Sequence, residues 1–187
     1  MPRYIPVRPF EKTLVVYASR TGCTADTAFS IAKHLRENGV PSDVLSIEEV
    51  NHLSGYSAVI IGSPIRYDKW LPEATSFINT HQTTLQNMPV AMFFTCLTLA
   101  QNSDKAKKQA QGYAASISTT LPQIKPSQIG QFAGVLDYST MPRIGRLFAR
   151  GVFAILRVKE GDYRNWEAIH SWVNSISFNK SAKEPSK

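Results

Sequence analysis

The sequence predicts an α/β fold with a doubly wound, five-stranded parallel sheet. Short apolar runs rich in β-branched residues alternate along the chain with longer segments that show helical spacing. Such alternation is typical of right-handed β–α–β units. The chain has 187 residues and a hydrophobic content of 43%, which suit one domain with its own core. We therefore expect the strand order 2-1-3-4-5, with helices on both faces of the sheet.

The apolar runs place the five strands at residues 13–18, 42–47, 58–62, 90–96 and 129–136. The first run reads TLVVYA, which suits a strand buried on both faces. Ser63 and Pro64 predict the end of the third strand, so that residues 65–70 form a loop.

Helical spacing predicts helices over residues 24–38, 73–82, 103–119 and 165–176. Gly39 follows the first helix as a stop signal, and Ser103 is the expected N-cap of the third. The last helix has an apolar side, formed by Trp166, Ile169, Trp172, Val173 and Ile176.

These elements predict one domain over residues 13–176, with an extension at 1–12 and a polar tail at 177–187. The chain has only two cysteines, Cys23 and Cys96, which predicts neither a disulfide framework nor a cysteine-rich metal site. Its four histidines lack the spacing of metal ligands, so we expect no metal. An apolar leader is absent from the first residues, and we expect a cytoplasmic location.

Three polar segments follow the first, third and fourth strands. In a doubly wound sheet the ligand lies beyond the carboxyl ends of the strands, at the switch point between strands 1 and 3. The first segment, residues 19–24, leads from a strand into a helix, where free backbone N–H groups and the helix dipole favour an anion. A simple capped helix start is the alternative. The spacing matches neither the Walker loop nor the dinucleotide fingerprint.

The first segment resembles the FMN phosphate loop of flavodoxins, whose pattern is roughly [ST]-x-T-G-x-T. Its residues are Ser19, Arg20, Thr21, Gly22, Cys23 and Thr24. The stretch VIIGSPIRY at 59–67, the stretch AGVLDY at 133–138 and the final Trp166 helix are similar to the menaquinone-dependent protoporphyrinogen IX dehydrogenases. The resemblance covers about residues 13–176.

This resemblance implies a flavodoxin-like fold that binds FMN, and an oxidoreductase of heme biosynthesis that passes electrons from a reduced organic substrate to a quinone. The phosphate would lie on the first loop. The flavin ring would lie between two further loops, formed by Ser63, Pro64, Ile65, Arg66 and Tyr67 and by Thr95, Cys96, Leu97 and Thr98. Tyr67 and Trp70 are the aromatic candidates beside the ring, with surface packing as the alternative for Trp70.

A basic segment at 141–160 follows the fifth strand and predicts a helical insertion. On a helix, Arg143, Arg146 and Arg150 share one side with Arg157, and apolar residues occupy another side. Such a helix suits contact with a carboxylate-bearing substrate or peripheral contact with an anionic membrane, here at the inner face of a membrane. The alternative is an ordinary surface helix whose apolar side packs on the domain.

Two further functions are consistent with the sequence: an electron carrier without its own substrate, and a binding module that lacks flavin. The net charge of +7 argues against the carrier, because shuttle flavodoxins are generally acidic. We expect no nucleic-acid partner, since the basic residues lack the interleaved aromatic residues of single-strand binders. The expected partner is a redox protein or a quinone.

Overall fold

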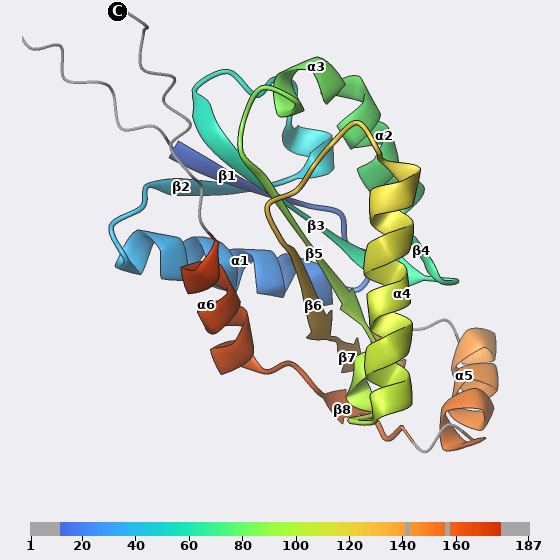
Figure 1. Cartoon of the computed structure of the whole chain (residues 1–187). Helices are drawn as coiled ribbons and strands as arrows, with labels where there is room; N and C mark the ends of the chain where they lie inside the picture. Colours follow the sequence, from blue (N-terminus) through green and yellow to red (C-terminus); the bar gives the residue numbers. More distant parts are fainter. Residues whose placement is uncertain (1–11, 141–142, 156–157, 177–187) are drawn as a thin grey trace, which may run out of the picture.

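A parallel sheet of five strands forms the middle layer of the fold, in the order β2-β1-β3-β5-β6 (Figure 1). The computed structural model describes residues 12–140, 143–155 and 158–176. The strands are β1 (Lys12–Tyr17), β2 (Ser42–Ser46), β3 (Tyr56–Arg66), β5 (Val90–Cys96) and β6 (Ile129–Ala133). Counted along the chain these are strands 2-1-3-4-5, so the structure confirms the predicted order.

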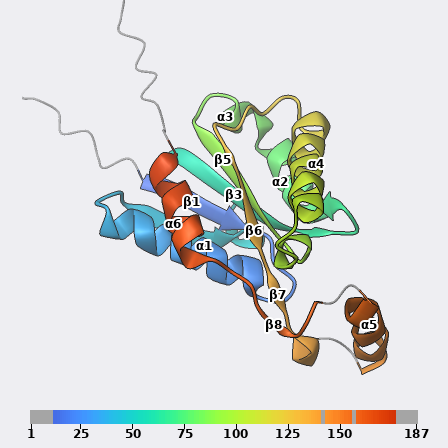
Figure 2. The ribbon, with the colours of Figure 1, turned by 60° about the horizontal axis from the view of Figure 1, so that its bottom comes forward.

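Helices cover both faces of this sheet, as Figures 1 and 2 show. One face carries α1 (Cys23–Glu37) and α6 (Trp166–Ser175), and the other carries α2 (Pro72–Thr80), α3 (Gln82–Leu85) and α4 (Asp104–Thr120). The alternation along β1 serves both layers, because Val15 belongs to the core under α1 and α6 while Leu14 and Val16 belong to the other core.

The helix caps follow from local sequence. The hydroxyl of Ser103 accepts a hydrogen bond from the N–H of Ala106, which confirms the predicted N-cap of α4. Asn165 caps α6 in the same way through the N–H of Ala168. The expected apolar side of α6 is wrong at its first residue, because Trp166 is exposed and lies against the guanidinium of Arg164.

The third strand is longer than predicted, and the loop expected at 65–70 is wrong. β3 runs through Pro64 to Arg66, then turns back into β4 (Lys69–Trp70), an antiparallel hairpin partner. The carbonyl of Gly62 faces β1, where it accepts from the N–H of Ala18, and Pro64 faces the same side two residues later. Because the pairing with β1 ends at Gly62, Pro64 has no ladder bond to lose there.

The fifth strand is shorter than predicted, because β6 ends at Ala133 and Gly134 breaks it. The N–H of Gly134 donates to the carbonyl of Cys96, while β7 (Val135–Leu136) pairs with β8 (Gly161–Asp162) in a separate two-stranded sheet. Between β7 and β8 the chain forms η3 (Tyr138–Thr140) and α5 (Arg143–Ile155), the predicted helical insertion.

Several expectations fall outside the described residues. The extension at 1–12 lies there except for Lys12, which begins β1, and so does the tail at 177–187. Within the described ranges, no helix combines the length and apolar character that crossing a bilayer requires.

Candidate functional site

Three connecting segments meet at the carboxyl edge of the sheet, at the ends of β1, β3 and β5. These strands are neighbours, so the segments that follow them lie at one edge (Figure 2). The edge includes the point where the strand order reverses between β1 and β3, which is where doubly wound folds bind their ligands.

The first segment leads directly into α1. Gly22 is the N-cap of this helix and has a φ of 86°, in the left-handed region that favours glycine. No side chain caps the helix, and the N–H of Gly22 itself donates to the hydroxyl of Ser19 at 3.1 Å. A Cβ added to Gly22 would meet nothing within 4 Å. The first turn of α1 therefore presents backbone N–H groups next to open space, a geometry that suits an anion.

The hydroxyl of Thr24 points to the interior instead of into this open space. It lies 2.8 Å from the hydroxyl of Thr95, and both side chains are buried. This bond joins the start of α1 to the end of β5. Thr24 and Thr95 thus fix two of the edge segments to each other, which sequence spacing does not reveal.

Arg20 is paired with a carboxylate across the edge. Its guanidinium donates to Glu73, which lies in the first turn of α2. Both side chains are partly exposed, so the pair contributes modestly to stability. The main effect of the pair is on position, because it holds the first edge segment near the end of the β3–β4 hairpin.

Sequence reasoning missed Arg164, which braces the first turn of α1. Its guanidinium donates to Asp26 at 2.9 Å and to Asp162, and its side chain is only 11% exposed. Hydrogen bonding to Asp162 raises the pKa of Arg164, and the same contact lowers the pKa of the Asp162 carboxyl. The cation neutralises Asp26, the one acidic side chain in that first turn. The two partners are 138 residues apart, so no local pattern signals their contact.

The two cysteines are packing residues in this arrangement. Burial raises the pKa of the Cys23 thiol despite its place at a helix start, although nearby Arg164 acts in the opposite direction. Burial likewise raises the pKa of Cys96, which belongs to the main core. Both groups therefore hold their protons at neutral pH, which favours a packing role over that of a reactive thiolate.

The second segment is the turn of the β3–β4 hairpin. Tyr67 and Asp68 have φ values of 51° and 60°, as a two-residue type I′ turn requires. Ser63 fixes the return of the hairpin, because its buried hydroxyl accepts from the N–H of Leu71 at 3.1 Å. Tyr67 is 93% exposed, so its ring is free to cover a planar ligand. Trp70, by contrast, is buried in the core, so the alternative of surface packing is wrong for it.

The third segment continues β5 through Leu97 into η2 (Thr98–Ala100). Thr98 lies 3.3 Å from the hydroxyl of Tyr113, whose O–H donates to Asp68 at 2.7 Å. These contacts join the third segment to the hairpin turn through a residue of α4. Leu97 packs against a small cluster formed by Leu136, Tyr138 and Val158, which connects the segment to the insertion.

The insertion helix α5 exposes the described residues of its apolar side. Arg146 donates to the carbonyl of Ser139, and Arg150 lies 5.4 Å from the ring centroid of Tyr138. Leu147 and Ile155, on the other side, are 76% and 84% exposed. The side chain of Arg143 lies outside the part of the chain that the structure describes. The alternative, in which the apolar side packs on the domain, is therefore wrong for these two residues.

The fold and the edge segments together define a class of protein: a doubly wound α/β protein of flavodoxin type, with a first loop whose geometry suits an anion. The model of the flavodoxin domain family matches residues 14–162. The chain belongs to this family. Membership of the family indicates a flavin cofactor.

Curated relatives are similar over most of the chain. The protoporphyrinogen IX dehydrogenase [quinone] of Escherichia coli strain K12 is 26% identical in an alignment of 176 positions, which covers 89% of this chain and 94% of that protein. The protein of the same name from Leishmania major is 27% identical in an alignment of 177 positions, which covers 89% of this chain and 74% of that protein.

Solved structures support the fold alone. The oxidised Flavodoxin 1 of Bacillus cereus superposes with a TM-score of 0.50 at 18% identity, covering 80% of this chain and all of that one. A short-chain flavodoxin associated with a bacterial microcompartment gives a TM-score of 0.51 at 12% identity, covering 78% of this chain and 98% of that one.

Proposed function

We propose that this protein is an FMN-dependent oxidoreductase that passes electrons from a reduced organic substrate to a quinone. The observation that supports this most is the N-terminus of α1. It has no side-chain cap, and it lies at the same edge as the segments that follow β3 and β5, beside the switch point of the sheet. An FMN phosphate fits there, because backbone N–H groups, the helix dipole and open space beside Gly22 coincide.

Each edge segment has its own part in this proposal. Backbone groups at 19–24 hold the phosphate, with the hydroxyls of Ser19 and Thr21 beside them. The segment from Pro64 to Tyr67 and the segment from Thr95 to Thr98 line the ring. FMN, when bound, supplies the redox chemistry by accepting electrons from the substrate and passing them to the acceptor. The protein's own residues bind it, orient it and limit access of water to it.

The proposed substrate class follows from the relatives and from the arginines of α5. Both relatives described above are named for protoporphyrinogen IX and a quinone. Arg146 and Arg150 lie on the side of α5 that faces η3, and guanidinium groups suit carboxylates such as those of a porphyrin. We place Arg143 with them from its helical position.

A turnover assay tests the proposal. Purified protein is incubated with FMN, protoporphyrinogen IX and a soluble quinone under anaerobic conditions, and protoporphyrin is followed by its absorption. We expect quinone-dependent formation of protoporphyrin above the rate without protein. The absence of a quinone-dependent rate, in protein that retains flavin, would exclude this substrate.

Stepwise reduction separates the enzyme from an electron carrier. A carrier of single electrons accumulates a flavin semiquinone, whereas an enzyme that transfers electron pairs need not. We expect little semiquinone on photoreduction of the FMN-loaded protein. Its accumulation, together with no turnover, would favour the carrier. A protein that stays colourless with FMN would favour the binding module.

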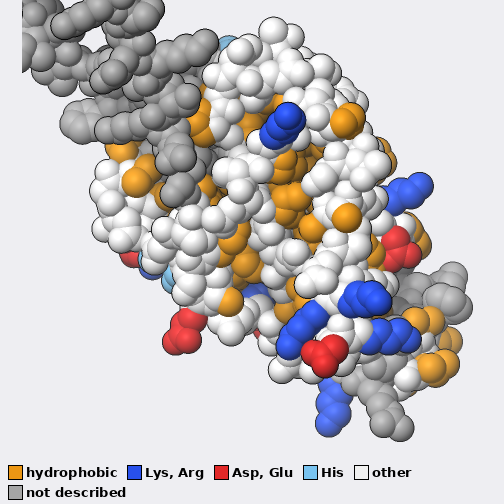
Figure 3. Space-filling model, in the orientation of Figure 1, with side chains coloured by type: hydrophobic (Ala, Val, Ile, Leu, Met, Phe, Trp, Pro, Cys, Tyr) orange, Lys and Arg blue, Asp and Glu red, His pale blue; other side chains and the backbone are white. Residues whose placement is uncertain are grey.

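The outward apolar side of α5 supports a peripheral contact with an anionic membrane. No acidic residue occurs between Arg143 and Ile155, and Figure 3 shows the apolar side chains of this region next to a group of Lys and Arg side chains. We expect the protein to float with vesicles that contain anionic lipid. Replacing these two exposed apolar residues by acidic ones, with Leu147→Glu and Ile155→Glu, should abolish flotation. Flotation that survives both changes would contradict this contact.

A further inference from the structure

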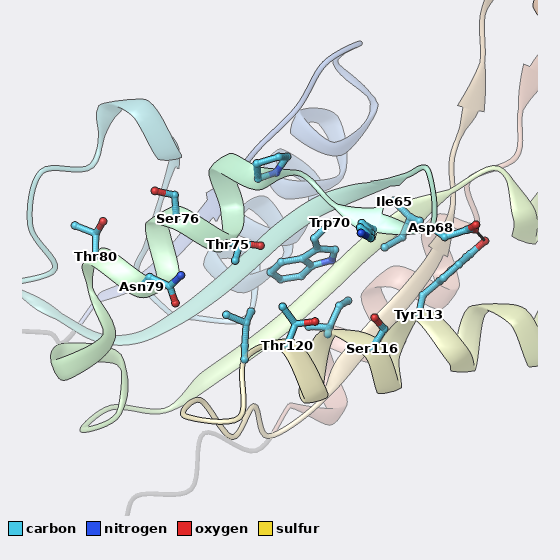
Figure 4. A pocket seen from close by; sticks show the side chains of 14 residues that line it. Ile65, Asp68, Trp70, Thr75, Ser76, Asn79, Thr80, Tyr113, Ser116 and Thr120 are labelled. Carbon is cyan, nitrogen blue, oxygen red and sulfur yellow. Dashed lines mark hydrogen bonds between the residues drawn. The ribbon is translucent and has the colours of Figure 1, made fainter.

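One cavity extends from the second edge segment, with which it shares Ile65 and Asp68, into the space between two helices. It has a volume of about 710 Å³ and lies between α2 and α4, beside the β3–β4 hairpin (Figure 4). Small-molecule sites in proteins have volumes of about 300–1,000 Å³, so the cavity has the size of a ligand site. None of the residues proposed to hold the phosphate lines it.

The lining of this cavity is apolar at its centre and neutral at its rim. Trp70 lies between the two helices, with Ile117 of α4 and Leu121, which follows α4, also in the lining. Side chains with hydroxyl or amide groups surround them, among them Thr75 and Asn79 of α2 and Ser116 and Thr120 of α4.

Formal charge is confined to one end of the cavity. The charged side chains of the lining are Asp68, which is acidic, and Lys69, which is basic. They are consecutive residues of the hairpin. Away from Lys69, an anionic ligand would lose its hydration without a cation to replace it. The cavity therefore favours an uncharged ligand.

The indole of Trp70 adds a polar preference. Its side chain is buried, and its Nε1–H has no acceptor among the described residues. In Figure 4 the indole nitrogen is on the side of the ring toward Tyr113 and Ser116. Buried polar groups in folded proteins are generally hydrogen-bonded, so an unpartnered indole N–H at a cavity favours a ligand with an oxygen acceptor.

The cavity is also connected to the proposed flavin site. Tyr113 lines it and donates its O–H to Asp68, while Gln109 donates to the hydroxyl of Tyr113 at 2.7 Å. The same hydroxyl lies 3.3 Å from Thr98, which follows β5 at the carboxyl edge. A ligand in the cavity would therefore contact a residue that also contacts the third edge segment.

We propose that the cavity between α2 and α4 binds an uncharged, flat, ring-containing small molecule whose carbonyl oxygen accepts a hydrogen bond from the indole of Trp70. This site is distinct from the proposed phosphate loop, and the proposal does not rest on FMN binding. The aromatic face of Trp70 and the apolar side chains of α4 bind the rings, and the hydroxyl-rich rim tolerates polar edges.

Coumarin, a neutral bicyclic lactone, is a suitable probe, and coumarin-3-carboxylate is its charged counterpart. The full chain, labelled with ¹⁵N, is titrated with each compound, with and without added FMN. We expect coumarin to shift the indole signal of Trp70 and to leave those of Trp166 and Trp172 in place. The carboxylate should bind roughly tenfold more weakly, a difference of about 1.4 kcal/mol.

A pair of variants on α4 provides the control. Thr120→Phe introduces a ring at the cavity rim, whereas Thr119→Phe places the same ring at an exposed neighbour outside the lining. Coumarin should bind the Thr119 variant as it binds the parent protein, and the Thr120 variant roughly tenfold more weakly. The amide spectrum of each variant reports its folding. An unshifted Trp70 signal in the parent protein, equal affinity for the carboxylate, or equal affinity of both variants would overturn the proposal.

Discussion

At the scale of single residues, the structure shows buried polar contacts where the sequence offers only side chains able to form them. Thr24 and Thr95 are the clearest case, because their hydroxyls are buried and face each other. From the sequence alone, Thr24 is expected to contact the phosphate and Thr95 the flavin ring. Together they fix the start of α1 to the end of β5, on which the shape of the edge depends.

Removing one of these hydroxyls should leave the other buried without a partner. We expect Thr24→Val and Thr95→Val each to lower the free energy of unfolding by about 1–3 kcal/mol, and the double variant to cost little more than either single change. Urea denaturation measures all three. The exposed change Thr83→Val should stay within about 0.5 kcal/mol of the parent. Additive losses would show that the two hydroxyls do not interact.

His170 makes stability depend on pH. Desolvation lowers its pKa, and the ring of His34, stacked at a centroid distance of 4.4 Å, acts in the same direction. Lys33 also lowers the pKa, Glu37 raises it, and the hydroxyl of Ser30 lies 2.9 Å from Nε2. Because the folded-state pKa is lower than the unfolded-state value, the unfolded chain takes up the proton first as pH falls. The fold should therefore lose stability below the ordinary pKa of histidine.

Thermal melts at about pH 7.5 and about pH 5.5 measure this effect. His170→Gln should lose less stability between the two pH values than the parent protein. His52→Gln provides the control, since His52 lies on the exposed surface away from α6. An unchanged pH dependence in the His170 variant would contradict this assignment.

At the scale of elements, Gly22 is the residue on which the geometry of the first edge segment depends. Its φ of 86° costs an alanine about 1–2 kcal/mol, which would shift the loop. We expect Gly22→Ala to weaken FMN binding roughly tenfold, as measured by quenching of flavin fluorescence. Gly39→Ala is the matched control at the other end of the same helix, with a φ of 77°. It should lower stability without a comparable loss of FMN affinity.

The sequence predicts elements best where burial alone decides them. The apolar run of β5 is buried at every position, and its predicted limits are those observed. The sequence does not predict the hairpin after β3, because a proline such as Pro64 ordinarily breaks a strand. Here Pro64 costs no ladder hydrogen bond, because the pairing with β1 ends at Gly62. The turn at Tyr67 and Asp68 lacks the Asn-Gly or Asp-Gly pair that signals a type I′ turn.

The orientation of α5 could not be predicted from its pattern. A helix with one apolar side ordinarily packs that side on its domain. Here contacts of Arg146 with Ser139 and of Arg150 with Tyr138 hold the opposite side inward. Those partners lie in η3, and only the three-dimensional structure brings them to the helix. The same applies to Arg164 and Asp26, which are in contact although 138 residues separate them in the sequence.

At the scale of the whole molecule, the topology converts separate local signals into one site. The order β2-β1-β3-β5-β6 makes β1, β3 and β5 neighbours, so that the segments after them share one edge. The insertion between β7 and β8 adds an exposed basic and apolar element at the end of the molecule where these two strands lie (Figures 1 and 2). The proposed cofactor site and the proposed membrane contact thus lie on neighbouring elements of the fold, which meet where Leu97 packs against the insertion.

The central claim is that the first edge segment binds the phosphate of FMN. Titration of the purified protein into FMN and into riboflavin, followed by flavin fluorescence, tests it most directly. Riboflavin has the same ring and lacks the phosphate. We predict saturable quenching of FMN at one equivalent of protein, and binding of riboflavin at least roughly tenfold weaker. Equal affinity for both flavins, or no quenching of FMN, would contradict the claim.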